Sequence, residues 1–211
     1  MSQPKKYTTL PTTHKYMELH VDNVISQWAE QNLSRIISAH RQKGGWEGWA
    51  QVEIATALQE STRRGHQPSS NSSSSPATTT TLAGEASREV DVYHATGQLA
   101  DIVIASRARR QFVIIELKCE GFHGRDFARG VAGDIAKLRG DIKDKFKPAR
   151  AWALAISTSS REYARMRRLW PTAKHKVLYD PGQGGSWWSG RGQSMDPKIV
   201  LWVFQREVVK L

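Results

Sequence analysis

Two apolar segments joined by a short polar stretch constrain the fold of this chain most strongly. Leu99–Ser106 (LADIVIAS) and Phe112–Glu120 (FVIIELKCE) are rich in the β-branched residues typical of buried or half-buried strands. The polar stretch 107–110 between them is short enough for a hairpin. We therefore expect the two segments to pair as antiparallel strands.

Three charged residues interrupt these apolar strands: Asp101, Glu116 and Lys118. A charge inside such a strand costs desolvation free energy unless it has a partner. If the turn is centred between Ala108 and Arg109, Asp101 lies opposite Glu116, with the two Cβ atoms roughly 5 Å apart. Because side chains alternate along a strand, Lys118 shares the face of Glu116. The sequence therefore predicts three charges meeting on one sheet face.

This grouping favours phosphodiester chemistry. Two adjacent carboxylates repel each other unless a cation lies between them, and Mg²⁺, which prefers oxygen ligands, suits this position. A neighbouring lysine can hold a nucleophilic water or stabilise a phosphorane-like transition state. The alternative is a solvent-facing Asp and a surface Glu-Lys pair on an ordinary hairpin. The apolar residues on both sides of Glu116 weigh against that alternative.

Asp101, followed by Glu116-Leu117-Lys118 at the end of an apolar strand, resembles the PD-(D/E)XK nuclease superfamily. Ala100 stands where the motif has Pro. The resemblance implies a restriction-endonuclease-like α/β core, a mixed central β-sheet flanked by α-helices, with element order matching over residues 46–156. It also implies a Mg²⁺-dependent nuclease, with Mn²⁺ able to substitute, in which a metal-activated water hydrolyses the phosphodiester bond. Asp101 and Glu116 would ligate the metal, and Lys118 would assist the attacking water.

The resemblance further implies an acidic residue in the helix before the first core strand. The segment GWEGWAQVEIATALQES is typical of an amphipathic helix, and Glu53 interrupts its apolar face. The inward stripe is expected to contain Trp46, Trp49 or Ala50, Glu53 and Ala57. We therefore predict Glu53 as a further catalytic and metal-binding residue. The alternative, a salt-bridged glutamate at the edge of the stripe, stays open, and Glu47 and Gln51 fall away from the stripe.

The remaining pattern predicts further helices and strands around the hairpin. Asp91, on the other face of the strand predicted before the hairpin, is an alternative metal ligand if the hairpin register is wrong. Ser159 and Glu162 have the spacing of a capping box that begins a helix. We expect helices at Met17–His40 (an extra N-terminal helix) and Asp126–Lys147, strands at Arg88–Tyr93 and Ala151–Ile156, and edge strands at Lys176–Tyr179 and Ile199–Phe204.

Composition favours one domain over residues 1–211, which the resemblance implies is nuclease-like, with a flexible Ser/Thr/Pro-rich insertion at 67–84. A chain of 211 residues that is 39% hydrophobic and has eight Trp can bury a substantial core. No apolar run approaches the roughly 20 residues that span a bilayer, and the polar start lacks a secretory signal. The lone Cys119 cannot form an internal disulfide, which fits a reducing compartment. We expect a soluble intracellular protein, cytoplasmic or nuclear, with no membrane partner, and the oligomeric state, homodimer included, stays open.

The formal net charge of +11 predicts a polyanionic partner, and nucleic acid is the partner that fits the candidate site, with DNA favoured over RNA. The basic side chains are concentrated in the second half of the chain. Those expected to bind the phosphate backbone are Arg107, Arg109, Arg110, Arg125, Arg129, Lys137, Arg161, Arg165 and Arg168. The alternative function is a nucleic-acid-binding module of the same fold with an idle acidic cluster.

Overall fold

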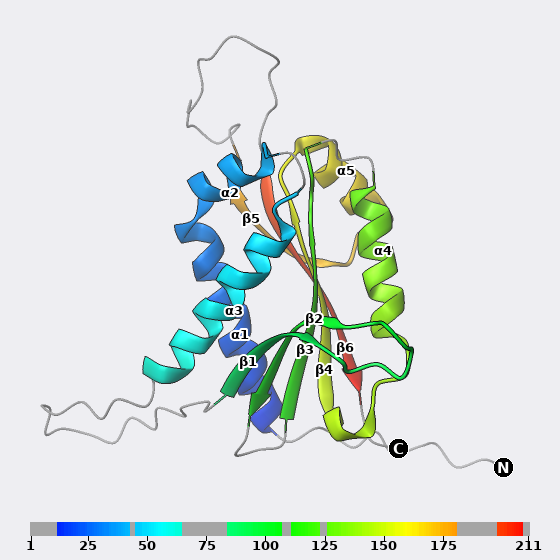
Figure 1. Cartoon of the computed structure of the whole chain (residues 1–211). Helices are drawn as coiled ribbons and strands as arrows, with labels where there is room; N and C mark the ends of the chain where they lie inside the picture. Colours follow the sequence, from blue (N-terminus) through cyan, green and yellow to red (C-terminus); the bar gives the residue numbers. More distant parts are fainter. Residues whose placement is uncertain are drawn as a thin grey trace, which may run out of the picture.

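The computed structural model describes residues 12–42, 45–64, 84–106, 111–122, 126–180 and 198–208. Within them, a six-stranded mixed sheet of order β1-β2-β3-β4-β6-β5 lies between two layers of helices (Figure 1). The strands are β1 (Gly84–Val90), β2 (Ala100–Ser106), β3 (Gln111–Cys119), β4 (Ala149–Ser157), β5 (Lys174–Tyr179) and β6 (Ile199–Val208). The helices are α1 (Thr12–Gln31), α2 (Leu33–His40), α3 (Glu47–Arg64), α4 (Phe127–Leu138) and α5 (Ser160–Leu169), with a 3-10 turn η1 (Asp144–Phe146). The predicted α/β class is confirmed, whereas the insertion predicted at 67–84 lies outside the described residues except for Gly84.

The hairpin and its register are confirmed. β2 and β3 are antiparallel, with Ile102 opposite Ile115 and Val103 opposite Ile114. The same register, continued by one residue, places Asp101 opposite Glu116. The apolar residues of both strands are buried, so a slip of one residue would turn each side chain to the wrong face.

The sheet becomes parallel at its centre. α4 connects β3 to the parallel strand β4, in register from Phe112 opposite Ala149 to Cys119 opposite Ile156. β6 was predicted as an edge strand, but it lies between β4 and β5 and is antiparallel to both. Its residues Leu201, Trp202 and Val203 are buried, which favours an interior position over an edge.

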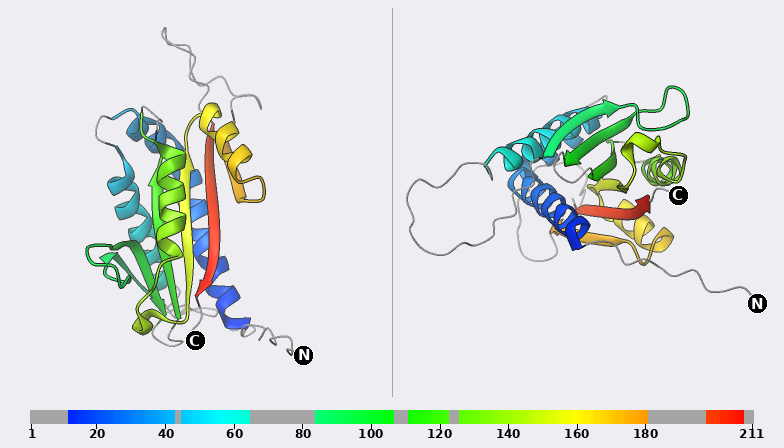
Figure 2. Two further views of the ribbon diagram at one scale, coloured as in Figure 1. Left: turned by 90° about the vertical axis from the view of Figure 1, so that its right-hand side faces the viewer. Right: turned by 90° about the horizontal axis from the view of Figure 1, so that it is seen from below.

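Alternation along β3 divides its side chains between the two helix layers. Val113, Ile115 and Leu117 pack against the core beneath α1 and α3. Ile114 belongs to the core on the opposite face, which includes Leu138 at the end of α4, and Glu116 and Lys118 share that face. The two views of Figure 2 show α4 lying over the strands on this side. The charged residues of β3 therefore lie beneath α4.

Three predicted boundaries were wrong. The helix predicted over Met17–His40 is two helices, α1 and α2, because the chain leaves helical geometry at Asn32, whose φ and ψ are −112° and 18°. The helix predicted over Asp126–Lys147 ends at Leu138, where glycine follows at 140 and Ile142 pairs with Tyr93. The strand predicted at Arg88–Tyr93 begins and ends earlier, at Gly84–Val90. No helix in the described ranges combines the length and apolar character needed to cross a membrane.

Candidate active site

Two carboxylates accept hydrogen bonds from the amides of β3 beyond the point where its pairing with β2 stops. The Leu117 amide donates to Asp101 Oδ2 at 2.7 Å, and the Cys119 amide donates to Glu47 Oε2 at 3.0 Å. The pairing of β2 with β3 stops at Ile102 opposite Ile115, so beyond this point side chains replace β2 as acceptors for the β3 amides. Satisfying these two N–H groups therefore fixes Asp101 and Glu47 against the end of the strand.

Glu116 lies next to this strand end, buried between two donors. Its side chain is 1% exposed. Tyr93 donates its hydroxyl to Glu116 Oε1 at 2.5 Å, and Lys137 donates from Nζ to Oε2 at 2.6 Å. Lys137 also donates to the Leu99 carbonyl. The carboxylate is therefore held by groups from α4 and from the segment before β2.

Lys118 lies between Gly130 of α4 and Glu47 at the start of α3. Its Nζ donates to Glu47 Oε1 at 2.9 Å. Its stem crosses α4 at Gly130, where an added Cβ would lie 2.7 Å from Lys118 Cδ and 3.0 Å from Cε. The absence of a side chain at Gly130 therefore allows Lys118 to reach Glu47.

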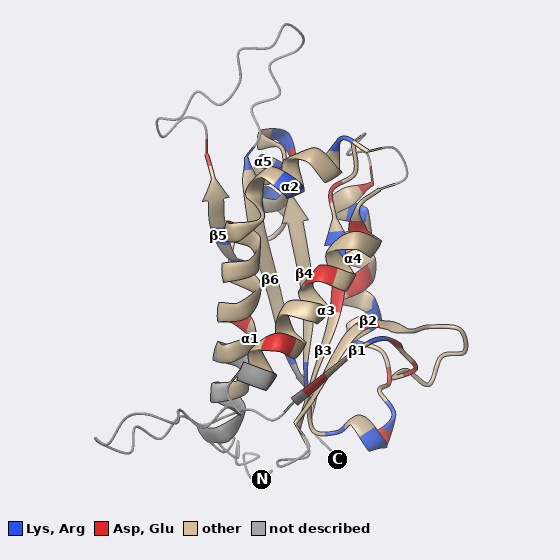
Figure 3. Ribbon diagram, turned by 60° about the vertical axis from the view of Figure 1, so that its left-hand side comes forward, with Lys and Arg blue, Asp and Glu red and all other residues tan. Residues whose placement is uncertain are grey.

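Asp134, one turn after Gly130 on α4, adds a carboxylate to the cluster. It interacts electrostatically with Lys118, Glu116, Asp101 and Glu47. Its Oδ2 is buried without a hydrogen-bond partner, which costs free energy unless another group satisfies it. In Figure 3, acidic and basic stretches of the ribbon lie next to one another at α4.

The electrostatics show an excess of negative charge. Burial, reinforced by neighbouring carboxylates, raises the pKa of Glu116 to about 7 despite the hydrogen bonds from Lys137 and Tyr93. Burial raises the pKa of Asp134 to about 7 and also raises that of Asp101. Burial alone would lower the pKa of Lys118, but the hydrogen bond to Glu47 and the surrounding carboxylates raise it overall, which keeps the ammonium charged. Four carboxyl groups thus surround two ammonium groups, an arrangement that a further cation would stabilise.

Glu53 does not belong to this cluster, so its predicted placement was wrong. It forms a two-pronged ion pair with Arg35 of α2, with N–O distances of 2.9 and 3.0 Å. The buried stripe of α3 runs through Trp46, Ala50, Ile54 and Leu58, which leaves Glu53 at its edge. Glu47, considered the weaker candidate, reaches the site instead.

Asp91, the alternative metal ligand, is also outside the cluster. It is 62% exposed and pairs with Lys143 at 2.5 Å. The confirmed hairpin register removes the condition on which that alternative depended.

A second buried network fixes α3 and α5 near the same strand ends. The Glu120 carbonyl accepts hydrogen bonds from the Trp46 indole at 2.8 Å and lies 2.9 Å from His40 Nδ1. The Glu120 carboxylate accepts from the amides of Thr158 and Ser159, at the start of α5. The predicted helix start is confirmed, since the Glu162 amide donates to Ser159 Oγ at 3.2 Å. The reciprocal half of the capping box was wrong, because the Ser159 amide donates to Glu120 and not to the Glu162 carboxylate. Because Trp46 precedes Glu47, this network positions the carboxylate that holds Lys118.

The residues predicted to bind nucleic acid differ in their exposure and in their contacts. Arg129, Arg161 and Arg168 are exposed, and Arg165, 34% exposed, lies 3.7 Å from Glu162. Lys137 does not belong to an outer basic face, because it points to Glu116. Arg107, Arg109, Arg110 and Arg125 lie outside the described residues.

The donor chemistry of the cluster fits a hard divalent cation, although the described side chains form no ready-made metal site. No group of three or more His, Cys, Asp and Glu residues in the described part of the chain is arranged to hold a metal ion. Lys137, Tyr93 and backbone amides instead satisfy oxygens of Glu116, Asp101 and Glu47. The orphaned Oδ2 of Asp134 and the all-oxygen donor set are what Mg²⁺ or Mn²⁺ would use.

Sequence reasoning missed Asp134 and Tyr93, and placed Lys137 on the wrong face. Asp134 did carry a signal, because it is the one acidic residue within α4, four positions after a glycine and three before a lysine. Tyr93 carried none, since its approach to Glu116 depends on a loop folding back across the sheet.

No protein-family model, curated protein or solved structure matches this chain. The geometry of the cluster and the sequence motif are therefore the features that indicate a function.

Proposed function

We propose that this protein is a divalent-metal-dependent nuclease of the PD-(D/E)XK type, with a restriction-endonuclease-like core, that hydrolyses phosphodiester bonds of nucleic acid. The observation that carries the proposal is the juxtaposition of Asp101 and Glu116 at one point of the β2–β3 pair with Lys118 held beside them by Glu47.

Each residue has a defined part in this proposal. Asp101 and Glu116 would hold the ion, and the unsatisfied oxygen of Asp134 would be available as a further donor. Bound there, a divalent ion supplies Lewis-acid polarisation of a water molecule and of the scissile phosphate. Lys118 orients the water or stabilises the charge that develops on the phosphate, and Glu47 fixes the direction of its ammonium group. Lys137 compensates the charge of Glu116 in the metal-free protein.

The decisive experiment compares wild-type protein with Lys118→Ala. Supercoiled plasmid, linear single strands and structured RNA are each incubated with Mg²⁺, with Mn²⁺ or with EDTA. We expect metal-dependent cleavage by the wild type and a loss of about 100-fold or more in Lys118→Ala, because a group that stabilises the transition state is removed.

The matched control is Lys176→Ala, which removes an exposed ammonium paired with Glu30 on the opposite side of the molecule. It should cleave at the wild-type rate. Equal rates for Lys118→Ala and the wild type would contradict the role of Lys118.

One observation favours a second function, a nucleic-acid-binding module that does not cleave. Both Glu116 oxygens are already occupied, by Tyr93 and Lys137. If these hydrogen bonds persist in Mg²⁺, the cluster is a structural network and not a catalytic one. Binding of nucleic acid by the wild type without cleavage in either metal would identify this case.

A further inference from the structure

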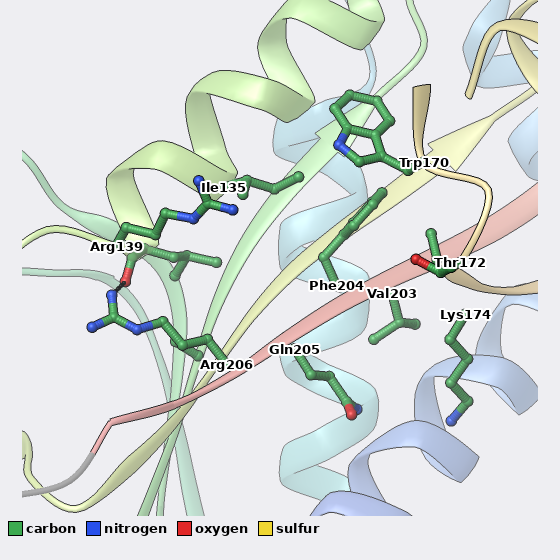
Figure 4. Close-up of a pocket in the computed structure, with 12 residues that line it drawn as sticks. Ile135, Arg139, Trp170, Thr172, Lys174, Val203, Phe204, Gln205 and Arg206 are labelled. Atoms are coloured by element: carbon green, nitrogen blue, oxygen red, sulfur yellow. Dashed lines mark hydrogen bonds between the residues drawn. The ribbon is translucent and has the colours of Figure 1, made fainter. Parts of the chain in front are cut away.

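A groove lies on the opposite side of α4 from the acidic cluster. Its volume is about 520 Å³, within the range of roughly 300–1,000 Å³ that is common for ligand sites. Figure 4 shows Trp170 and Phe204 in its middle, with Arg139 and Arg206 near one end and Lys174 near the other. Ile135 of α4 and Ala151 of β4 also line it.

The groove combines an aromatic surface with positive charge. Trp170 and Phe204 pack edge to face, with ring centroids 5.3 Å apart. None of the twelve described residues that line the groove is acidic. Arg206 donates from one guanidinium nitrogen to the Leu138 carbonyl at 2.7 Å, which anchors this side chain beside the exposed Arg139. An apolar, aromatic surface next to guanidinium groups suits a flat base attached to a phosphate.

The outward face of α4 connects this groove to the candidate active site. At 100° per residue, Gly130, Asp134 and Lys137 form the flank toward the cluster, and Ile135 and Arg139 form the flank toward the groove. The exposed arc between the two flanks, continued past the end of α4, carries Arg129, Ala132, Gly133, Ala136 and Gly140. Within α4 this arc has no acidic and no bulky apolar side chain. The carboxylate of Asp126, directly before the helix, is paired with Arg129, so a phosphate backbone could cross the rest of the helix at close range.

We infer that this groove binds an unpaired segment of the nucleic acid, with a base against Trp170 and Phe204 and phosphates at Arg139 and Arg206, after the strand has crossed α4 from the active site. The inference rests on the proposed nuclease function and specifies it further, since it assigns single-stranded nucleic acid as the form the protein binds. A duplex is too wide to place one base inside the groove while its partner strand stays paired.

The test measures binding in EDTA, where metal-dependent cleavage cannot occur. A fluorescein-labelled single-stranded oligodeoxynucleotide and the duplex of the same sequence are titrated with full-length protein, and the dissociation constant Kd is read from fluorescence anisotropy. Arg139→Ala removes a groove cation, and Gln205→Glu adds an anion at an exposed lining residue. We expect each change to raise the single-strand Kd about fivefold or more, and Arg139→Ala to reduce the salt slope by about 0.7.

Two matched variants serve as controls. Gln205→Lys alters the same side chain without adding negative charge and should not raise Kd. Arg41→Ala removes an exposed guanidinium at the end of α2, on the other side of the sheet, and should change Kd less than about twofold. A 2-aminopurine in the strand should lose fluorescence on binding to the wild type and keep it with Trp170→Leu, since stacking quenches the base.

Equal effects of Arg139→Ala and Arg41→Ala, or equal weakening of duplex and single-strand binding, would overturn the inference. Its failure is distinguishable from failure of the nuclease proposal. Cleavage without any dependence on the groove variants contradicts the groove alone, whereas groove-dependent binding without cleavage in Mg²⁺ or Mn²⁺ supports the groove and contradicts the nuclease.

Discussion

Glu116 is the residue on which the charge balance of the cluster depends. It is buried on a sheet face, opposite Asp101 in the continued register, and it interacts electrostatically with Asp134. Lys137 and Tyr93 stabilise its charged form, but burial outweighs them and its pKa rises. Keeping this carboxylate ionised therefore lowers the stability of the metal-free fold.

This cost makes the free energy of unfolding depend on pH. The pKa of Glu116 rises from 4.5 to about 7 on folding, so between these values the folded chain binds more protons than the unfolded chain, and stability falls as pH rises. Glu116→Gln lacks this titration. Its free energy of unfolding relative to wild type should increase by about 3 kcal/mol from pH 4.5 to pH 8, at about 1.4 kcal/mol per pKa unit.

Urea denaturation in EDTA at the two pH values measures this difference. Glu53→Gln, which removes a carboxylate outside the cluster, is the control for loss of charge alone. A difference between Glu116→Gln and wild type that does not vary with pH would contradict the assignment.

Gly130 provides a test of Lys118 that does not remove any charged group. Gly130→Ala favours the helix by roughly 0.5–1 kcal/mol, but its Cβ must displace the Lys118 stem. Gly133→Ala has the same helical benefit, and its Cβ meets nothing within 4 Å. We expect both variants to melt at or above the wild-type temperature, and only Gly130→Ala to lose cleavage, by about tenfold or more.

The acylation rate of Lys118, followed by mass spectrometry, reports its position independently of activity. It should rise in Gly130→Ala, because Nζ leaves Glu47. Identical cleavage and acylation in the two alanine variants would show that Gly130 does not position Lys118.

Asp101, Glu116 and Lys118 could be predicted from the sequence because charges in β-branched strands are costly without partners. The glutamate predicted on α3 was the wrong one. A shift of one residue in the assumed stripe rotates a helix by about 100°, and the true stripe passes through Ala50 and Ile54. Glu47 reaches the cluster from the first turn of α3, where its contact with the Cys119 amide depends on tertiary structure.

Among the elements, α3 contributes most to the difference between the predicted and observed sites. Its first turn is fixed by the Trp46 hydrogen bond to the Glu120 carbonyl. Glu47→Gln should therefore reduce the cleavage rate about 10–100-fold, as expected for loss of a group that orients a catalytic side chain. Glu53→Gln, on the same helix, should retain the wild-type rate. Steady-state cleavage assays of both variants test this, and the reverse order of effects would restore the sequence-based choice.

The order of elements from α3 to α5 and the β2–β3 register followed from apolar periodicity and a short turn. The lengths of α1 and α4 did not, because Asn32 and Gly140 end helical runs whose apolar spacing continues past them. The interior position of β6 depends on long-range pairing with β4, which no local pattern encodes.

For the whole molecule, the net charge of +11 predicts strong electrostatic binding of nucleic acid. The Kd for a single-stranded oligonucleotide in EDTA should rise at least tenfold between 50 mM and 200 mM salt, since several phosphate contacts release counterions. Fluorescence anisotropy across this range measures the slope. A Kd independent of salt would show that the basic surface does not bind the phosphate backbone.

In the proposed nuclease, Asp101 and Glu116 share a divalent cation within reach of Lys118. Anomalous diffraction from crystals grown with Mn²⁺ locates such an ion. We predict an anomalous peak about 2.1–2.2 Å from carboxylate oxygens of Asp101 and Glu116, with the Lys137 ammonium withdrawn from Glu116. Crystals in which Mn²⁺ is absent from this position, with Lys137 and Tyr93 still bound to Glu116, would contradict the proposal.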